Sequence, residues 1–155
     1  RNAEGNRNEF FRRAPQKRSG AVKIKRRDVK MNLIISIKPQ FVSKIISKEK
    51  KYEFRKNIPK KPVEKIFIYS TVPDKEIVGY FECDKVIEDT PDNLWNNFSK
   101  DAGISKQNFF EYFLEKEKGF AMEISKLTLF NDPIDVDDIC GFVAPQSFKY
   151  VDYDF

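Results

Sequence analysis

The sequence predicts a single α+β domain, built as a partly closed, mixed β-barrel of five or six strands with two or three short helices packed at its openings. Several short stretches alternate apolar and polar residues or are continuously apolar, which is typical of β-strands. Two stretches with helical spacing follow one another as a group, which favours α+β over a repeating strand–helix unit. With 155 residues and 14% aromatic residues, the chain suffices for one packed core.

The first half of the predicted domain carries strands and one helix. Four apolar stretches predict strands, at residues 33–37, 52–55, 63–71 and 77–87. Between the first two, Phe41, Val42, Ile45 and Ile46 share one face of a predicted helix.

Two helices follow, and both have clear start and stop signals. Thr90 is a predicted N-cap with Pro91 in the first helical position, and Gly103 is predicted to end this helix. Ser105 is the predicted N-cap of the second helix, which ends before Gly119. Their apolar positions are expected to pack into the core: Leu94, Trp95, Phe98, Phe109, Phe110, Phe113 and Leu114.

The last third of the chain contains a strand with a change of register. Its apolar residues occupy even positions up to Ile124 and odd positions from Leu127, so the inward-facing set slips by one residue. Such a slip predicts a β-bulge near residues 125–126. An acidic loop and a last strand are expected at residues 131–138 and 147–151.

Positive charge is concentrated in two segments of a chain whose formal net charge is +5. Residues 1–30 hold 11 Lys and Arg against 3 Asp and Glu, and residues 44–65 hold 9 against 3. Residues 66–155 hold 8 against 18, a net charge of −10. Without residues 1–30, the rest of the chain holds 18 Lys and Arg against 21 Asp and Glu and is therefore acidic overall. An acidic domain that concentrates positive charge in one segment is suited to bind an anion there. The alternative is a solvated face of lysines.

The charge pattern also predicts the domain boundaries. Residues 1–30 are expected to be a basic, disordered extension, because they contain few apolar residues. This segment could attract nucleic-acid phosphates, or it could be an upstream read-through or a cloning remnant, since Met31 opens the first credible strand. The folded domain is expected at residues 31–151, with a short tail at 152–155.

The composition excludes several classes of site. The absence of histidine excludes Ser-His-Asp and Cys-His catalysis and His-ligated zinc. Cys83 and Cys140 are too far apart for a CxxC motif, and residues 131–138 lack the glycine and terminal glutamate of an EF-hand loop. We therefore expect no metal and no cofactor. With a mean hydropathy of −0.61 and no apolar run near the roughly 20 residues that cross a bilayer, we expect a cytoplasmic protein without membrane contact.

One charged segment combines a motif with a chemical rationale. Residues 48–55 contain Lys50, Glu53 and Arg55 at the spacing Lys-x-x-Glu-x-Arg. This segment resembles the signature of the ASCH family, a branch of the PUA-like superfamily, whose pattern is Gly-x-Lys-x-x-Glu-x-Arg. Lys48 stands where the family has glycine, so either this turn needs no left-handed glycine or the pattern is degenerate here. The order of predicted elements over residues 31–151 is also similar to the family, which implies a PUA-like fold.

The spacing of the motif gives it a physical interpretation of its own. Glu53 and Arg55 point to the same side of a strand, while Tyr52 and Phe54 point to the other. The planar fork of Arg55 suits a phosphate or a base edge, and Glu53 can orient it. Lys50 adds a point charge. The alternative is an ion pair that only ties the strand to its neighbour.

The resemblance implies that RNA or a nucleotide binds in a cleft beside the signature. Tyr69 would then stack on a base, although burial inside the barrel is an equal alternative. The candidate ligand-binding residues are Lys50, Glu53, Arg55, Lys48, Lys51, Tyr69 and Ser70.

Three functions follow as alternatives. The leading hypothesis is binding of RNA, single-stranded nucleic acid or a nucleotide. The second is a hydrolase of the ASCH type, with Lys50 as base and Glu53 as its partner, acting as a ribonuclease or as an amidohydrolase on acylated cytidine. The amidohydrolases of the family use a threonine three residues after the lysine, where this chain has Glu53. The third is a protein-interaction module that uses the acidic half of the chain.

Overall fold

The computed structural model describes residues 31–155, so the expectations for residues 1–30 lie outside it. The strands are β1 (Met31–Ile37), β2 (Tyr52–Arg55), β3 (Val63–Ser70), β4 (Glu76–Glu82), β5 (Val86–Asp89), β6 (Gly119–Glu123), β7 (Ser125–Asp135) and β8 (Phe148–Val151). The helices are α2 (Pro39–Ile46), α3 (Pro91–Phe98) and α4 (Lys106–Tyr112), with 3-10 turns η2 (Ser99–Asp101) and η3 (Val136–Asp138). The α+β class with three short helices is confirmed for this range, and the strands number eight rather than five or six.

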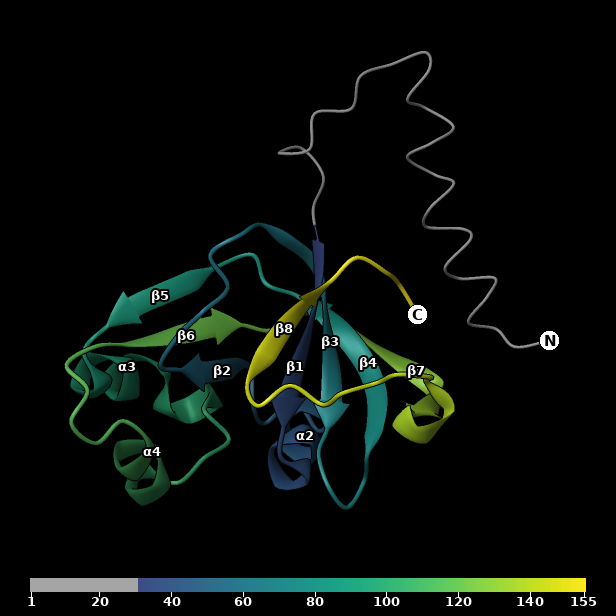
Figure 1. The fold of residues 1–155 in the computed structure, drawn as a ribbon. Helices are drawn as coiled ribbons and strands as arrows, with labels where there is room; N and C mark the ends of the chain where they lie inside the picture. The colour runs from purple at the N-terminus through teal and green to yellow at the C-terminus, as the bar shows by residue number, and fades with distance from the viewer. Residues whose placement is uncertain (1–30) are drawn as a thin grey trace, which may run out of the picture.

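The strands form two separate sheets, which lie side by side in Figure 1. The larger sheet has the order β7-β4-β3-β1-β8, and the smaller one has the order β2-β6-β5. β1 and β3 run parallel, while the other pairs are antiparallel, so the larger sheet is mixed as predicted. In Figure 1, α2 lies beneath β1, and α3 and α4 lie with the smaller sheet. The sheets do not close into one barrel.

The chain crosses between the two sheets at places where the sequence pattern suggests continuous strands. The stretch predicted as one strand at 77–87 is divided into β4 in the larger sheet and β5 in the smaller sheet. Similarly, the chain passes from β6 to β7 at Ile124. Hydrophobic alternation reports only which face is buried, so it does not reveal a change of sheet.

The predicted β-bulge is present. Tyr80 pairs with Thr128 and Glu82 pairs with Ser125, so β7 has one residue more than β4 over this interval. The expected acidic loop at 131–138 is wrong in part, because β7 continues to Asp135 and η3 follows. Gly79 lets β7 approach β4 closely, since a Cβ there would collide with the carbonyl oxygen of Thr128.

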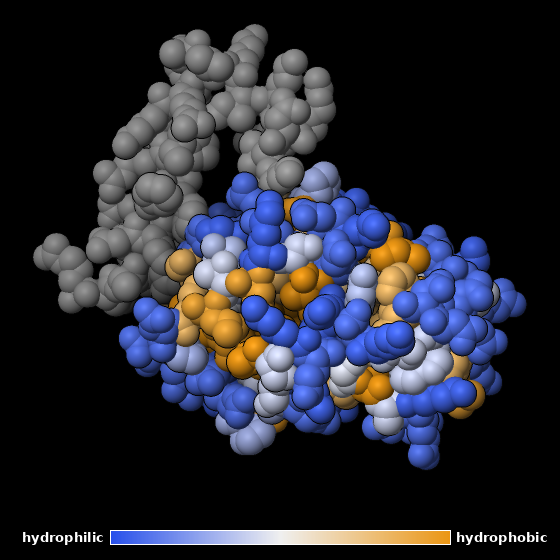
Figure 2. All heavy atoms as spheres, turned by 180° about the vertical axis from the view of Figure 1, so that it is seen from behind, coloured by the Kyte–Doolittle hydropathy of each residue, from blue (hydrophilic) through white to orange (hydrophobic). Residues whose placement is uncertain are grey.

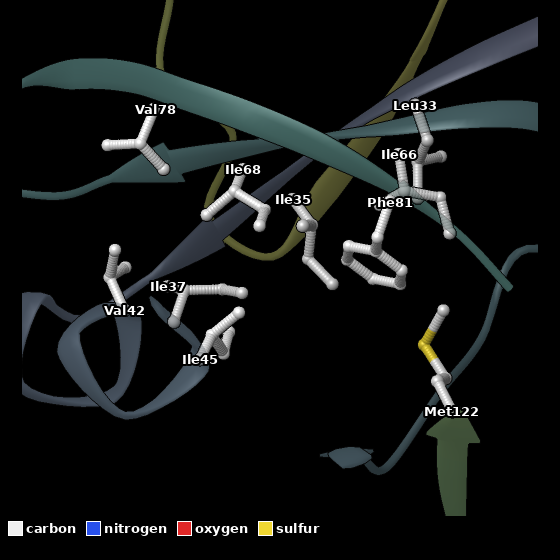
Figure 3. Packing of buried hydrophobic residues seen from close by; sticks show 10 residues of the cluster. All are labelled: Leu33, Ile35, Ile37, Val42, Ile45, Ile66, Ile68, Val78, Phe81 and Met122. Atoms are coloured by element: carbon white, nitrogen blue, oxygen red, sulfur yellow. The ribbon is translucent and has the colours of Figure 1, made fainter. Parts of the chain in front are cut away.

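The main core lies on one face of the larger sheet and joins the two sheets (Figure 3). Its members come from β1, β3, β4, α2 and β6: Leu33, Ile35, Ile37, Val42, Ile45, Ile66, Ile68, Val78, Phe81 and Met122. Met122 belongs to the smaller sheet, so its burial here fixes that sheet against the larger one.

The other face of the larger sheet is covered by the C-terminal part of the chain. The ring of Phe155 packs edge-on against Phe67 with centroids 4.9 Å apart. Asn32 donates a hydrogen bond from its side chain to the carbonyl oxygen of Tyr153, at 2.8 Å. Residues 152–155 therefore pack on the sheet. Because both faces are covered, β1 and β3 are continuously apolar at their centres.

A separate hydrophobic cluster joins the smaller sheet to α3 and α4. It contains Phe54, Leu94, Ala102, Phe109, Phe113 and Ala121. The predicted N-caps are confirmed, since Thr90 accepts a hydrogen bond from the Asn93 N–H and Ser105 accepts one from the Asn108 N–H. Leu114 departs from the prediction and is largely exposed.

The surface is predominantly hydrophilic on the face opposite to that of Figure 1, with smaller hydrophobic areas between the polar side chains (Figure 2). Within residues 31–155, no helix has the length and apolar character needed to cross a membrane.

Candidate functional site

An open pocket of about 660 Å³ lies where the larger sheet, α2, β2 and α4 meet. Lys50, Glu53 and Arg55 line it together, so the three residues of the sequence motif share one cavity. Phe41 of α2 and Tyr112 of α4 also line it. Ser36 of β1 and Arg55 of β2 both line it, so the pocket lies between the two sheets.

The end of α2 brings Lys50 into the pocket. Lys48 adopts the left-handed conformation with φ 67°, and its N–H donates to the carbonyl oxygen of Ile45. The Lys50 N–H then donates to the carbonyl oxygen of Lys44, at 3.0 Å. The turn thus requires a left-handed residue, and Lys48 supplies it where the family pattern has glycine.

The Lys50 side chain is 4% exposed and has several partners. Its ammonium group donates to the carbonyl oxygen of Ala102 at 2.9 Å and lies 3.5 Å from a carboxylate oxygen of Glu53. It also lies 5.6 and 5.1 Å from the ring centroids of Phe41 and Phe54. Burial lowers the pKa of Lys50, and this effect outweighs the opposing attraction of Glu53.

Gly103 makes room for Lys50. It has φ +61°, and a Cβ at this position would lie 2.5 Å from the Cβ of Lys50. The prediction that Gly103 ends the helix after Thr90 is wrong, because α3 already ends at Phe98 and η2 follows it. The glycine instead lets the Lys50 side chain approach closely.

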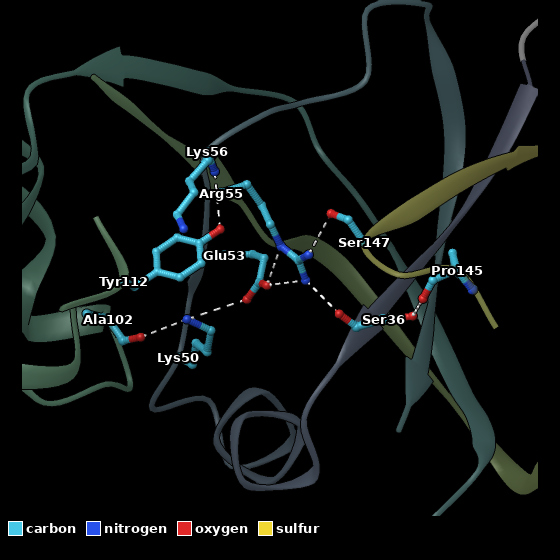
Figure 4. Close-up of polar contacts among 9 residues, drawn as sticks. All are labelled: Ser36, Lys50, Glu53, Arg55, Lys56, Ala102, Tyr112, Pro145 and Ser147. Carbon is cyan, nitrogen blue, oxygen red and sulfur yellow. Dashed lines mark hydrogen bonds and ion pairs between the residues drawn. The ribbon is translucent and has the colours of Figure 1, made fainter. Parts of the chain in front are cut away.

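Glu53 and Arg55 form a buried ion pair on one side of β2 (Figure 4). The Arg55 Nε donates to Glu53 Oε2 at 2.8 Å, and Nη2 lies 2.7 Å from the same oxygen. Nη2 also donates to the carbonyl oxygen of Ser36, and Nη1 donates to the Ser147 hydroxyl at 3.1 Å. The motif is thus both a structural ion pair and part of a pocket wall.

The three motif side chains leave an excess of positive charge. With every group ionised, two cations share one carboxylate, so the cluster carries a formal charge of +1. All three side chains are at most 12% exposed, and solvent screens buried charges poorly. The cluster can therefore attract an anion into the pocket, or Lys50 can release its proton.

Tyr112 is a pocket residue that sequence reasoning missed. Its hydroxyl accepts a hydrogen bond from the Lys56 N–H at 3.2 Å, and the Lys56 ammonium lies 4.6 Å from its ring centroid. Burial raises the pKa of Tyr112, so the phenol stays protonated at neutral pH. The aromatic pattern of this helix was interpreted only as core. The available signal was the polar face formed by Asn108, Glu111 and Tyr112 at helical spacing.

Four candidate residues do not line this pocket. Lys48 is exposed, and Lys51 is exposed with its ammonium 3.9 Å from the Asp101 carboxylate. Tyr69 is buried on the opposite face of the larger sheet, with its ring 5.3 Å from that of Phe142. Ser70 is buried and donates to the Asp74 carboxylate.

Several carboxylates of the acidic half pair with lysines of the same domain. Asp137 pairs with Lys75, and the Asp135 side chain accepts from the Asp137 N–H at the start of η3. In the part of the chain that the structure describes, no group of three or more Cys, Asp or Glu side chains is placed to hold a metal ion.

Similarity to known proteins extends over most of the described domain. No family model matches the chain. An ASCH domain-containing ribonuclease from Zymomonas mobilis is 29% identical over 123 residues, which cover 76% of this chain and 82% of that protein. The crystal structure of ASCH from Zymomonas mobilis superposes with a TM-score of 0.71 at 29% identity, covering 77% of this chain and 87% of that one.

Two relatives from Ureaplasma parvum are much longer than the similar segment. ATP synthase subunit alpha is 28% identical over 123 residues, which are 79% of this chain but 15% of that protein. Large ribosomal subunit protein uL22 is 29% identical over 103 residues, 66% of this chain and 33% of that protein. The Zymomonas mobilis protein and crystal structure confirm the resemblance to the ASCH domain family that the sequence carries.

Proposed function

We propose that this ASCH domain binds RNA, and that the pocket beside Lys50, Glu53 and Arg55 holds a phosphate-bearing part of it. The carrying observation is the excess positive charge of this buried cluster at the wall of an open pocket. Buried charge without full compensation is costly, so an incoming phosphate gains more here than at an exposed lysine. The relative named as an ASCH domain-containing ribonuclease supports RNA as the ligand.

RNA binding can be tested by fluorescence anisotropy with a labelled RNA oligomer and the full chain. Lys50→Met retains the length of the side chain and removes its charge. We expect it to weaken binding by about tenfold, since hydrogen bonds to charged groups contribute about 1.5–3 kcal/mol. Affinity should also fall as salt rises, because phosphate contacts release counterions.

Lys116→Met is the matched control, because Lys116 is exposed and does not line the pocket. Residues 1–30 carry a net charge of +8 and are the same in both variants, so the comparison of the two substitutions cancels any contribution from them. Equal affinities of Lys50→Met and Lys116→Met would refute the proposed site. Binding of free nucleotides but not RNA would refute RNA as the ligand.

A second function, RNA cleavage, is supported by the lowered pKa of Lys50. A neutral Lys50 amine can accept the proton of a ribose 2′-hydroxyl. The 2′ oxygen then bonds to phosphorus, the bond to the 5′ oxygen breaks, and water protonates that oxygen, which leaves a 2′,3′-cyclic phosphate. Glu53 would stabilise the lysine once it is protonated.

Lys50→Arg separates binding from cleavage, because arginine keeps the charge and stays protonated. We expect RNA binding to be retained within a few fold and cleavage to be lost. Cleavage by Lys50→Arg at the rate of the unmodified protein would contradict Lys50 as the base. No release of acetate from acetylated cytidine is expected, because Glu53 occupies the position of the threonine used by the family's amidohydrolases. A basic protein partner for residues 66–155 stays a prediction.

A further inference from the structure

We propose that the mouth of this pocket carries an outer phosphate seat, formed by Tyr112, Lys56, Ser147 and the outer edge of the Arg55 guanidinium. The ligand is a phosphate group of RNA or of a nucleotide. The assignment to RNA rests on the proposed function, whereas the seat itself can be tested with inorganic phosphate.

Tyr112 contributes an unused hydrogen-bond donor. Its hydroxyl oxygen accepts from the Lys56 N–H, but within residues 31–155 its own proton has no acceptor. A phenol can donate one hydrogen bond while it accepts another. Since burial also raises its pKa, the proton is retained at neutral pH. Figure 4 shows the Tyr112 hydroxyl and Arg55 on the same side of the motif, beside Lys56.

Arg55 and Ser147 contribute two further donors. Arginine has five N–H groups, and Arg55 donates three hydrogen bonds, from Nε to Glu53, from Nη2 to Ser36 and from Nη1 to Ser147, while Nη2 also lies 2.7 Å from Glu53 Oε2. One N–H of Nη1 is left. The Ser147 oxygen accepts from Arg55, and its own proton has no acceptor in the described part of the chain. Figure 4 shows Arg55 between Tyr112 and Lys56 on one side and Ser147 on the other.

Lys56 supplies the charge of the seat. Its ammonium lies over the Tyr112 ring and forms no ion pair with any described carboxylate. Glu111 also lines the pocket, and its negative charge disfavours the binding of a phosphate. Its carboxylate accepts a hydrogen bond from the Gln107 side chain. The seat thus offers three free donors, from the Tyr112 hydroxyl, the Ser147 hydroxyl and Arg55 Nη1, and the unpaired ammonium of Lys56. These groups match the acceptor oxygens and the negative charge of a phosphate.

The seat also orients the ligand. With a phosphate at the mouth, the sugar and base extend inward towards Phe41, which lines the same pocket. The amide side chains of Asn108 and Gln146 line it as well and have no side-chain hydrogen bond among residues 31–155. They are free to contact a base edge.

The experiment compares uridine 5′-monophosphate, uridine and inorganic phosphate as ligands of the full chain by isothermal titration calorimetry. Tyr112→Phe keeps the ring and removes the hydroxyl. We expect it to weaken binding of the monophosphate and of inorganic phosphate by about tenfold and to leave uridine binding unchanged. Lys56→Met should act in the same way, and Glu111→Gln should strengthen phosphate binding about twofold to threefold.

Tyr80→Phe is the matched control. Tyr80 also has a lysine over its ring, with the Lys65 ammonium 4.7 Å from the centroid, but it does not line the pocket. Equal affinities of Tyr112→Phe and Tyr80→Phe for the monophosphate would overturn the seat. An equal loss of uridine and monophosphate binding in Tyr112→Phe would overturn it as well.

The two proposals fail in different ways. If RNA binding depends on Lys50 but not on the Tyr112 hydroxyl, the outer phosphate seat is wrong and the proposed function stands. If inorganic phosphate binding depends on Tyr112 while RNA binding is insensitive to Lys50→Met, the seat stands and the proposed function is wrong.

Discussion

Glu53→Gln should strongly destabilise the domain, because Glu53 is the carboxylate that compensates two buried cations. It accepts two close contacts from Arg55, at 2.8 and 2.7 Å, and lies 3.5 Å from the Lys50 ammonium. Glutamine has nearly the same shape but no charge. The substitution therefore leaves Lys50 and Arg55 as unpaired cations in a site that water reaches poorly.

The magnitude follows from burial. The exposed fractions of the side chains are 4% for Lys50, 8% for Glu53 and 12% for Arg55. Removing one partner of a buried ion pair costs about 3–5 kcal/mol of the free energy of unfolding. Since the glutamine carbonyl still accepts a hydrogen bond, we expect the lower end, about 3 kcal/mol. For a chain of this size this corresponds to a fall in Tm of about 6–12 °C.

Thermal and urea denaturation monitored by circular dichroism measure the effect. Glu49→Gln is the matched control, because Glu49 pairs with Lys44 at 2.9 Å but the two side chains are 57% and 49% exposed. An exposed pair of this kind contributes about 0–1 kcal/mol. The same chemical change at a similar distance should thus have a much smaller effect.

The reasoning would be refuted if Glu53→Gln and Glu49→Gln lowered the free energy of unfolding equally. A double variant gives a second criterion. Adding Lys50→Met to Glu53→Gln should recover part of the loss, since it removes one of the unpaired cations. A double variant that loses the sum of the two single effects would show that Lys50 and Glu53 are not coupled.

Three further predictions concern the surroundings of Lys50. Lys48→Gly should raise the free energy of unfolding by about 1 kcal/mol, because Lys48 has φ 67°, and an unchanged urea midpoint would contradict this. Gly103→Ala should lower it by at least about 1–2 kcal/mol and weaken RNA binding, because the residue has φ +61° and its added Cβ meets the Lys50 side chain. Since burial lowers the Lys50 pKa, the unfolded state binds the Lys50 proton more tightly than the folded state does. Stability should therefore gain from this group as pH rises from the lowered folded-state pKa towards the ordinary value of 10.5, and Tm measurements should show that Lys50→Met loses this gain.

Local signals in the sequence predicted the elements whose causes are local. The N-caps at Thr90 and Ser105 depend on contacts within three residues, and both were predicted correctly. The bulge near residue 125 was visible as a slip in alternation. The division of 77–87 between two sheets was not visible, because pairing partners lie far apart in the chain.

The candidate site divides in the same way. Sequence alone determined that Glu53 and Arg55 share one side of a strand, because side chains alternate with a period of two along a strand. It also placed Lys50 near them, since Lys50 precedes Glu53 by three residues. Only the tertiary structure decided that Tyr112 and Ser147 flank Arg55, because their hydrogen-bond partners, Lys56 and Arg55, lie 56 and 92 residues away in the chain. The tertiary structure likewise decided that Tyr69 faces away from the pocket, since its ring packs against Phe142 on the other face of the sheet.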